Sequence, residues 1–102
     1  MQIANFQFLK KLNQLPFVDV VWLYGSRARG DHRERSDIDL AIVCPNATSS
    51  DWLQILSIIE ENTDTLLKID CVRFDTLSKG SLKENILKDH KALFERARKK
   101  DV

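Results

Sequence analysis

Residues 18–43 read VDVVWLYGSRARGDHRERSDIDLAIV, and this stretch decides the fold. It opens with β-branched and aromatic residues over 18–24, a composition typical of a strand covered on both faces. Gly25 and Ser26 end that strand, and the polar segment that follows predicts a short helical turn and a loop. Residues 37–43, DIDLAIV, predict a second strand. The stretch therefore predicts a unit of two strands joined by a turn, with most of the charged residues in the segment that joins them.

Helices and a further strand are predicted on both sides of this unit. Apolar residues at near-helical spacing from Ile3 to Leu12 indicate an opening helix that ends near Pro16. The remaining predicted elements are a helix over about 48–62, a strand over 66–74, a helix opened by a capping box from Ser81 to Glu84, and a short edge strand over 91–95. This order predicts an α/β domain with helices packed on a small mixed sheet.

Size and composition narrow the class of protein. A chain of 102 residues suits one core, so we expect a single domain over 1–102. No apolar run approaches the ~20 residues of a membrane helix, so no membrane contact is expected. The formal net charge of +1 is too balanced for general attraction to nucleic acid, so direct nucleic-acid binding is not expected either. Only three glycines are present, which excludes the G-x-G-x-x-G fingerprint and the P-loop.

The cysteines and the start of the chain indicate the compartment. Cys44 and Cys71 each lie in an apolar segment, and together with the two histidines they lack the spacing of a zinc finger. We therefore expect both cysteines to be free core residues. The first residues do not resemble a signal peptide, so a reducing cytoplasm is the expected location.

Gly25 and Ser26 form a candidate phosphate-binding turn. A glycine directly after a buried strand lets the backbone bend and lets a ligand approach closely. Ser26 can then present its hydroxyl and the free N–H groups of a helical turn to a phosphate. Arg27, or Arg29 after it, could reach the same phosphate, and Arg27 is included among the predicted nucleotide-binding residues. The alternative is an ordinary strand-to-helix turn followed by a solvated, charged loop.

Three aspartates on the predicted strands are candidate metal ligands. Side chains alternate along a strand, so Asp37 and Asp39 point to one face and Ile38 to the other. Two carboxylates near a core are costly unless a cation compensates, and Mg²⁺ prefers such oxygens. Asp70 interrupts the apolar third strand and can face the same site if that strand lies beside the second. The alternatives are a solvated strand end for the pair and an ion pair with an arginine for Asp70.

Three carboxylates around one or two metal ions are typical of phosphoryl and nucleotidyl transfer. In this interpretation one metal holds the triphosphate and the other lowers the pKa of an attacking hydroxyl, while Asp70 assists as the base. Asp75 is the alternative third acid, although it lies beyond the predicted strand.

Gly25-Ser26, ten further residues and Asp37-Ile38-Asp39 resemble the G-S-x10-D-x-D signature of the DNA polymerase beta-like nucleotidyltransferase superfamily. The longer stretch GSRARGDHRERSDIDLAIV is similar to the minimal nucleotidyltransferases of prokaryotes, the MNT group, and the resemblance extends over about 18–94. It implies a mixed sheet flanked by helices, one or two Mg²⁺ ions and a nucleoside triphosphate. By this resemblance Gly25 and Ser26 match the phosphate-binding turn, and the catalytic, metal-binding acids are Asp37, Asp39 and Asp70.

The resemblance also implies a partner, because minimal nucleotidyltransferases are typically encoded beside a HEPN-domain protein and act as its antitoxin. The implied reaction is transfer of AMP from ATP to a tyrosine hydroxyl of that toxin. The alternative is a nucleotide-binding module that neutralises its partner by steric contact alone. Transfer to a small molecule such as an aminoglycoside fits less well, because 102 residues leave little room for an acceptor domain.

Overall fold

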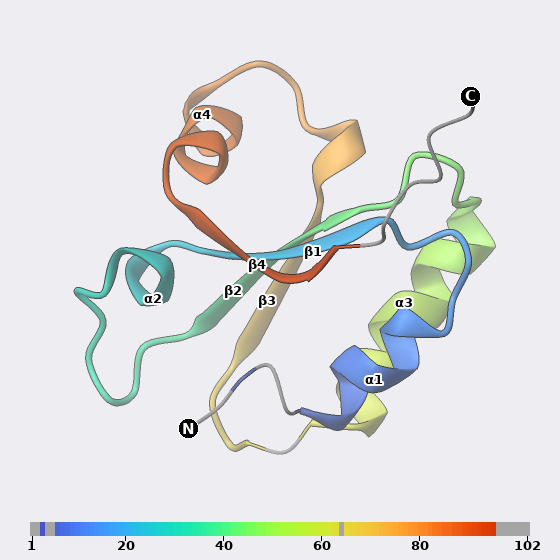
Figure 1. The fold of residues 1–102 in the computed structure, drawn as a ribbon, viewed down its shortest axis with the longest axis horizontal. Coiled ribbons are helices and arrows are strands. Elements are labelled where there is room, and N and C mark those ends of the chain that lie inside the picture. The colour runs from blue at the N-terminus through green and yellow to red at the C-terminus, as the bar shows by residue number, and fades with distance from the viewer. Residues whose placement is uncertain (1–2, 4–5, 64, 96–102) are drawn as a thin grey trace.

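The computed structural model describes residues 3, 6–63 and 65–95, and it shows a four-stranded sheet with helices on both of its faces (Figure 1). The strand order is β3-β2-β1-β4. Strand β1 pairs antiparallel with β2 and β4, whereas β2 pairs parallel with β3, so the predicted mixed sheet is confirmed. In chain order the elements are α1 (Gln7–Asn13), β1 (Val20–Tyr24), α2 (Ser26–Arg29), β2 (Ile38–Val43), α3 (Ser49–Glu61), β3 (Ile69–Arg73), the 3-10 turn η2 (Phe74–Thr76), α4 (Ser81–Lys88) and β4 (His90–Glu95).

The main core lies between the sheet and the helices α1 and α3, which cover the same face (Figure 1). Phe8 and Leu12 of α1 and Ile55 of α3 are completely buried there. Strand β2 contributes every second residue to this core, namely Ile38, Leu40 and Ile42. This alternation leaves Asp39 on the opposite face of the sheet, where α4 packs with its buried Ile86.

Helix α3 follows its sequence signal closely. Thr48 is the N-cap, and its hydroxyl accepts a hydrogen bond from the Asp51 N–H at 3.1 Å. The Asp51 carboxylate in turn accepts from the Thr48 N–H at 2.9 Å, which completes a capping box. Helical spacing predicts a core-facing stripe of Trp52, Ile55, Leu56 and Ile59. The structure buries Ile55 and Ile59 and leaves the other two half-buried.

Three details of the predicted elements are wrong. The third strand begins at Ile69 rather than at residue 66, and Leu66 is fully exposed. The last helix has Gly80 as its N-cap, without a side-chain cap, so the predicted Ser81 capping box does not form. Strand β1 is fully buried on one face only, because Trp22 and Tyr24 on its other face are half-buried.

The cysteines agree with their predicted role in part. Cys44 is completely buried and Cys71 is half-buried, and both are free thiols. Burial raises the pKa of Cys44 to about 11 and that of Cys71 to about 12, so both thiols stay protonated at neutral pH. None of the described helices is long and apolar enough to cross a membrane. The predicted domain limits, 1 and 102, lie outside the described residues.

Candidate active site

The turn between β1 and α2 requires a glycine. Gly25 is the N-cap of α2 and has φ 74° and ψ −152°, a conformation that is essentially restricted to glycine. A Cβ atom at this position would lie 2.6 Å from Oδ2 of Asp39. The backbone of Gly25 therefore lies directly against the Asp39 carboxylate, which occupies the space that a side chain at residue 25 would need.

Strand register brings two of the predicted acids together. Asp39 of β2 pairs with Asp70 of β3 on one side and with Tyr24 of β1 on the other, and Tyr24 pairs with His90 of β4. Cross-strand partners point to the same face, so these four side chains form a row across the sheet. Asp37 lies two residues before Asp39, just outside β2, and is exposed.

The electrostatics of Asp39 show that the acids act on one another. Burial raises the pKa of Asp39, and the carboxylates of Asp70 and Asp37 raise it further, while Arg29 lowers it. The pKa of Tyr24 is also raised, first by burial and then by Asp39 and Asp70. A concentration of negative charge thus lies beside the turn at Gly25, with Asp39 at its centre.

Asp70 occupies the edge strand and remains accessible. Its carboxylate lies 3.5 Å from the Lys68 ammonium, and the two side chains are 43% and 71% exposed. An exposed pair of this kind contributes little stability and is easily separated. The alternative prediction, an ion pair with an arginine, is therefore not what the structure shows.

Asp75, the alternative third acid, is engaged elsewhere. One of its carboxylate oxygens accepts a hydrogen bond from the Cys44 N–H at 2.9 Å, and the other pairs with Arg73 at 3.0 Å. Arg73 also donates to the carbonyl groups of Cys44 and Ala47. This half-buried cluster joins the end of β3 to the loop after β2, so Asp75 has a structural role.

The two arginines of α2 differ in their contacts. The guanidinium of Arg27 donates to the Ser36 carbonyl at 2.9 and 3.2 Å and to the Glu34 carbonyl at 3.2 Å. Arg29 forms an exposed ion pair with Asp31 at 3.1 Å, and its charge acts on Asp39. Of the two, Arg29 is better placed to approach a phosphate beside Asp39. The sequence does not distinguish them, because both side chains belong to the same short turn.

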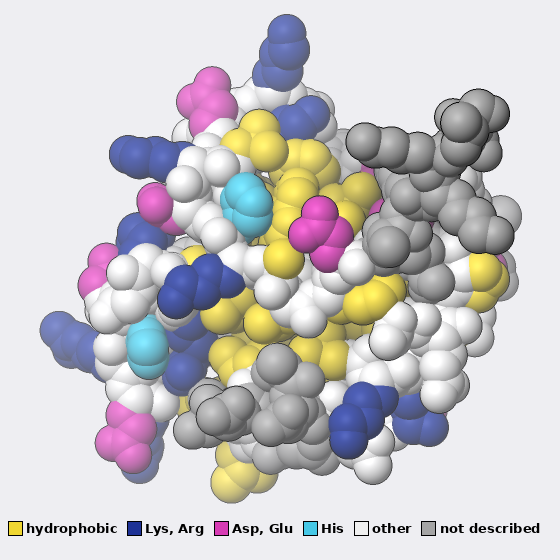
Figure 2. Space-filling view, in the orientation of Figure 1, with side chains coloured by type: hydrophobic (Ala, Val, Ile, Leu, Met, Phe, Trp, Pro, Cys, Tyr) yellow, Lys and Arg dark blue, Asp and Glu magenta, His cyan; other side chains and the backbone are white. Residues whose placement is uncertain are grey.

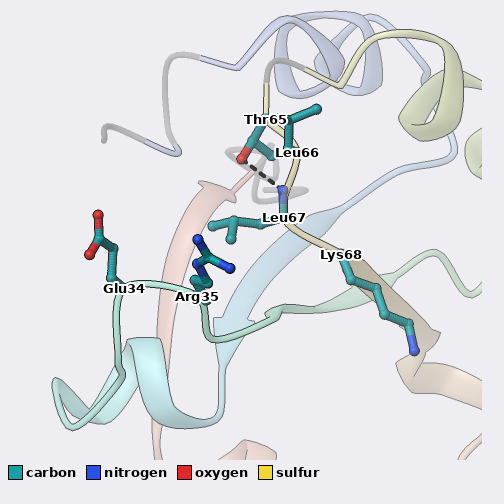
Figure 3. Close-up of a pocket in the computed structure, with 6 residues that line it drawn as sticks. All are labelled: Glu34, Arg35, Thr65, Leu66, Leu67 and Lys68. Atoms are coloured by element: carbon teal, nitrogen blue, oxygen red, sulfur yellow. Dashed lines mark hydrogen bonds between the residues drawn. The ribbon is translucent and has the colours of Figure 1, made fainter.

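A pocket of about 850 Å³ lies between the loop before β2 and the segment before β3 (Figure 3). Arg35 points toward Leu67 on one side, while Lys68, the partner of Asp70, points away from them. The remaining lining residues are Glu34, Thr65 and Leu66. The pocket adjoins the start of both acid-bearing strands but is not lined by the acids themselves.

Among the residues that the structure describes, the face of the protein shown in Figure 2 carries no large patch of one charge. Side chains of both signs are interspersed on the face shown in Figure 2, around a hydrophobic area over the sheet. This agrees with the formal net charge of +1. The surface as a whole is therefore not expected to attract a polyanionic ligand.

The donor set fits a divalent metal ion. Carboxylate oxygens are the ligands that Mg²⁺ prefers. Burial is the main cause of the raised pKa of Asp39, and a cation would relieve the repulsion from Asp70 and Asp37 that raises this pKa further. Within residues 3, 6–63 and 65–95, no three His, Cys, Asp or Glu side chains lie so that they could hold a metal ion as they stand. The residues that would hold the ion are Asp37, Asp39 and Asp70.

The fold and this arrangement of residues define a nucleotidyltransferase domain. The family model described as "Polymerase beta, Nucleotidyltransferase" matches residues 7–99, and the chain belongs to this family. The predicted superfamily and its fold are thereby confirmed. A search of curated proteins found no match.

Several solved structures with the same fold are structures of toxin–antitoxin pairs. A toxin–antitoxin crystallised with AMP-PNP is 20% identical and matches with a TM-score of 0.67, over 93% of this chain and 75% of the other. The complex of the tri-AMPylated Shewanella oneidensis HEPN toxin with its MNT antitoxin is 20% identical, with a TM-score of 0.61 over 94% and 74% of the two chains. The MntA–HepT toxin–antitoxin is 19% identical, with a TM-score of 0.60 over 93% and 74%. At these identities the similarity establishes the fold alone.

Proposed function

We propose that this chain transfers AMP from ATP to a hydroxyl group of a partner protein, a tyrosine of a HEPN toxin, and so acts as its antitoxin. The observation that carries the proposal is the pairing of Asp39 with Asp70 beside the turn at Gly25. Membership of the nucleotidyltransferase family supports the reaction class. The nature of the acceptor and the antitoxin role rest on the similarity to the toxin–antitoxin structures.

In the proposed reaction the residues have separate roles. The N–H groups and the hydroxyl at Ser26 bind the triphosphate, because α2 begins there with free donors, and Arg29 adds a positive charge. Asp37, Asp39 and Asp70 would hold Mg²⁺, which when bound would neutralise phosphate charge and lower the pKa of the acceptor hydroxyl. Asp70 also accepts the proton of that hydroxyl, because it lies on the edge strand, where a partner protein can reach it.

The chemical step conserves atoms and charge. The acceptor oxygen forms a bond to the α-phosphorus of ATP as the bond from that phosphorus to the bridging oxygen of the β-phosphate breaks. Pyrophosphate leaves with the electron pair of the broken bond, and the hydroxyl proton passes to the Asp70 carboxylate. The product is a phosphodiester between AMP and the partner's side chain.

Intact-mass measurement tests the proposal. The chain is incubated with the HEPN-domain protein encoded beside it, Mg²⁺ and each nucleoside triphosphate in turn, and both proteins are then weighed. We expect a mass increase of one AMP unit on the partner with ATP, and none with the variant Asp37→Asn/Asp39→Asn, which should still bind the partner.

The matched control is Glu61→Gln/Glu95→Gln, which removes two exposed carboxylates, one at the end of α3 and one opposite Val20, at the end of β1 that is remote from the turn. It should modify the partner as the wild type does. If the aspartate variant neutralises the toxin without any covalent adduct, the chain acts by steric contact and the proposed transfer is wrong.

A further inference from the structure

Arg27 connects the phosphate-binding turn to the strand that bears the acids. It lies in α2, directly after Ser26, and its guanidinium reaches across the loop to residues 34 and 36. The Ser36 carbonyl accepts from both Nη2, at 2.9 Å, and Nε, at 3.2 Å, and Nη2 also donates to the Glu34 carbonyl at 3.2 Å. Ser36 is the residue immediately before Asp37. One side chain thus links the two halves of the candidate site.

The loop that Arg27 contacts has little packing to hold it. Residues 31–35 are exposed, so hydrogen bonds must define their conformation. Within the loop, the Arg33 N–H donates to Oγ of Ser36 at 2.8 Å, and the Ser36 N–H donates to the Arg33 carbonyl at 3.0 Å. These bonds close the loop on itself, whereas the Arg27 bonds attach it to α2.

We propose that Arg27 is a positioning residue that sets the place of Asp37 by holding the Ser36 carbonyl against α2, and that it does not bind phosphate. The role in activity rests on the proposed function, whereas the role in loop conformation does not. The planar edge of the guanidinium presents two donors to one carbonyl, an arrangement that the single ammonium of lysine cannot reproduce. Arg29, which is exposed and held by one ion pair, remains for the phosphates.

Two substitutions separate positioning from charge. Arg27→Lys keeps the positive charge and removes the paired hydrogen bonds, and Arg27→Gln removes both. If Arg27 positions the loop, both variants should lose kcat by about 10²-fold, while the KM for ATP changes by less than about threefold. The control is Arg33→Lys, the same exchange at an exposed position of the same loop that does not line the pocket, which should leave kcat and KM unchanged.

Hydrogen exchange supplies a readout that does not depend on activity. In both Arg27 variants the amides of Arg33, Ser36 and Ile38 should exchange roughly tenfold faster, while the core amides of β1 keep their protection. Thermal unfolding confirms that each variant is folded.

Two results would overturn the proposal. One is unchanged exchange of the loop amides in both variants. The other is near-normal activity of Arg27→Lys together with a raised KM for ATP in Arg27→Gln, since this pattern is expected of a charge that binds phosphate. If the wild-type chain transfers no nucleotide at all, the proposed function fails, and the exchange measurement still decides whether Arg27 holds the loop.

Discussion

Gly25 meets two separate requirements at one residue. Its backbone conformation, φ 74° and ψ −152°, excludes side chains on steric grounds, and the space that a Cβ would need is filled by the Asp39 carboxylate. Gly30, at the other end of α2, also has a positive φ, of 86°, but a Cβ atom there would meet no other atom within 4 Å. The two glycines therefore provide a matched pair for experiment.

We expect Gly25→Ala to destabilise the protein by more than Gly30→Ala, which should cost about 1–2 kcal/mol for its left-handed backbone. Gly25→Ala should also abolish nucleotide transfer, because Asp39 must move away from the new methyl group. Urea unfolding gives the free energies, and mass measurement gives the activity. Equal destabilisation by the two substitutions would show that the contact with Asp39 is unimportant.

Asp39 should make stability depend on pH. Because its pKa in the folded protein lies above the ordinary value of 3.8, the folded state binds this proton more tightly than the unfolded state. The contribution of Asp39 to the free energy of unfolding is therefore lost as the pH rises from 3.8 through the higher pKa of the folded state. We expect Asp39→Asn to be more stable than the wild type at neutral pH, with the difference disappearing in acid.

Urea unfolding of both proteins across this pH range measures the difference. Mg²⁺ added at neutral pH should stabilise the wild type more than Asp39→Asn, because the cation relieves a repulsion that the variant lacks. A variant less stable than the wild type at neutral pH would contradict the expectation.

At the scale of elements, periodic segments were predictable and irregular ones were not. Helix α3 shows both an apolar stripe and an N-cap candidate at Thr48 or Ser49, and these local signals place it correctly, whereas its capping box emerges only in the structure. The segment before β3 is apolar as well, yet Leu66 is exposed, because an apolar run alone does not show where strand pairing begins. Ser81 and Glu84 have the spacing of a capping box, but Gly80 takes the N-cap position.

The candidate site was predictable as a set of residues but not as an arrangement. The signature from Gly25 to Asp39 lies in one short stretch, so it can be read directly from the sequence. That Asp70 pairs with Asp39 depends on which strands are neighbours, and this is settled only by the sheet order. Arg27, rather than Arg29, donates to the loop before β2. This choice depends on the direction of each side chain, and the spacing of residues in a four-residue helix does not specify it.

Replacing Asp70 should affect activity but not stability, and replacing Asp75 should affect stability. The reason is that Asp70 is exposed on β3, whereas Asp75 is hydrogen-bonded beyond the end of that strand. Asp75→Ala leaves the Cys44 N–H and Arg73 without their half-buried acceptor, so it should destabilise the protein by about 1–3 kcal/mol. Asp70→Ala loses only an exposed ion pair and should change stability by less than about 0.5 kcal/mol, yet abolish transfer. Urea unfolding measures the stability of both variants, and mass measurement measures their transfer activity. If Asp70→Ala keeps its activity, Asp70 does not belong to the proposed site.

At the scale of the whole molecule, one cluster of buried side chains connects α1, the sheet and α3. A single core of this kind predicts one cooperative unfolding transition. Trp52 of α3 packs against this core, whereas Trp22 contacts Phe74 and His90 on the other face of the sheet.

The two tryptophans therefore report on both faces of the sheet. We expect tryptophan fluorescence and far-ultraviolet circular dichroism to give coincident urea transitions in the wild type and in variants that retain only one of the two tryptophans. Separate transitions for Trp22 and Trp52 would show that the layers unfold independently, and the proposal of a single domain would then be wrong.

The parallel pairing of β2 with β3 also has a consequence for the order in which the site is made. Antiparallel neighbours can follow one another directly, but parallel neighbours need a connecting segment, and here α3 lies between them. A ribosome therefore delivers the turn and the first two acids well before Asp70, with α3 emerging in between. A growing chain can therefore contain the turn and the first two candidate acids while it still lacks the third, so the proposed transfer can begin only after the crossover has been synthesised and packed.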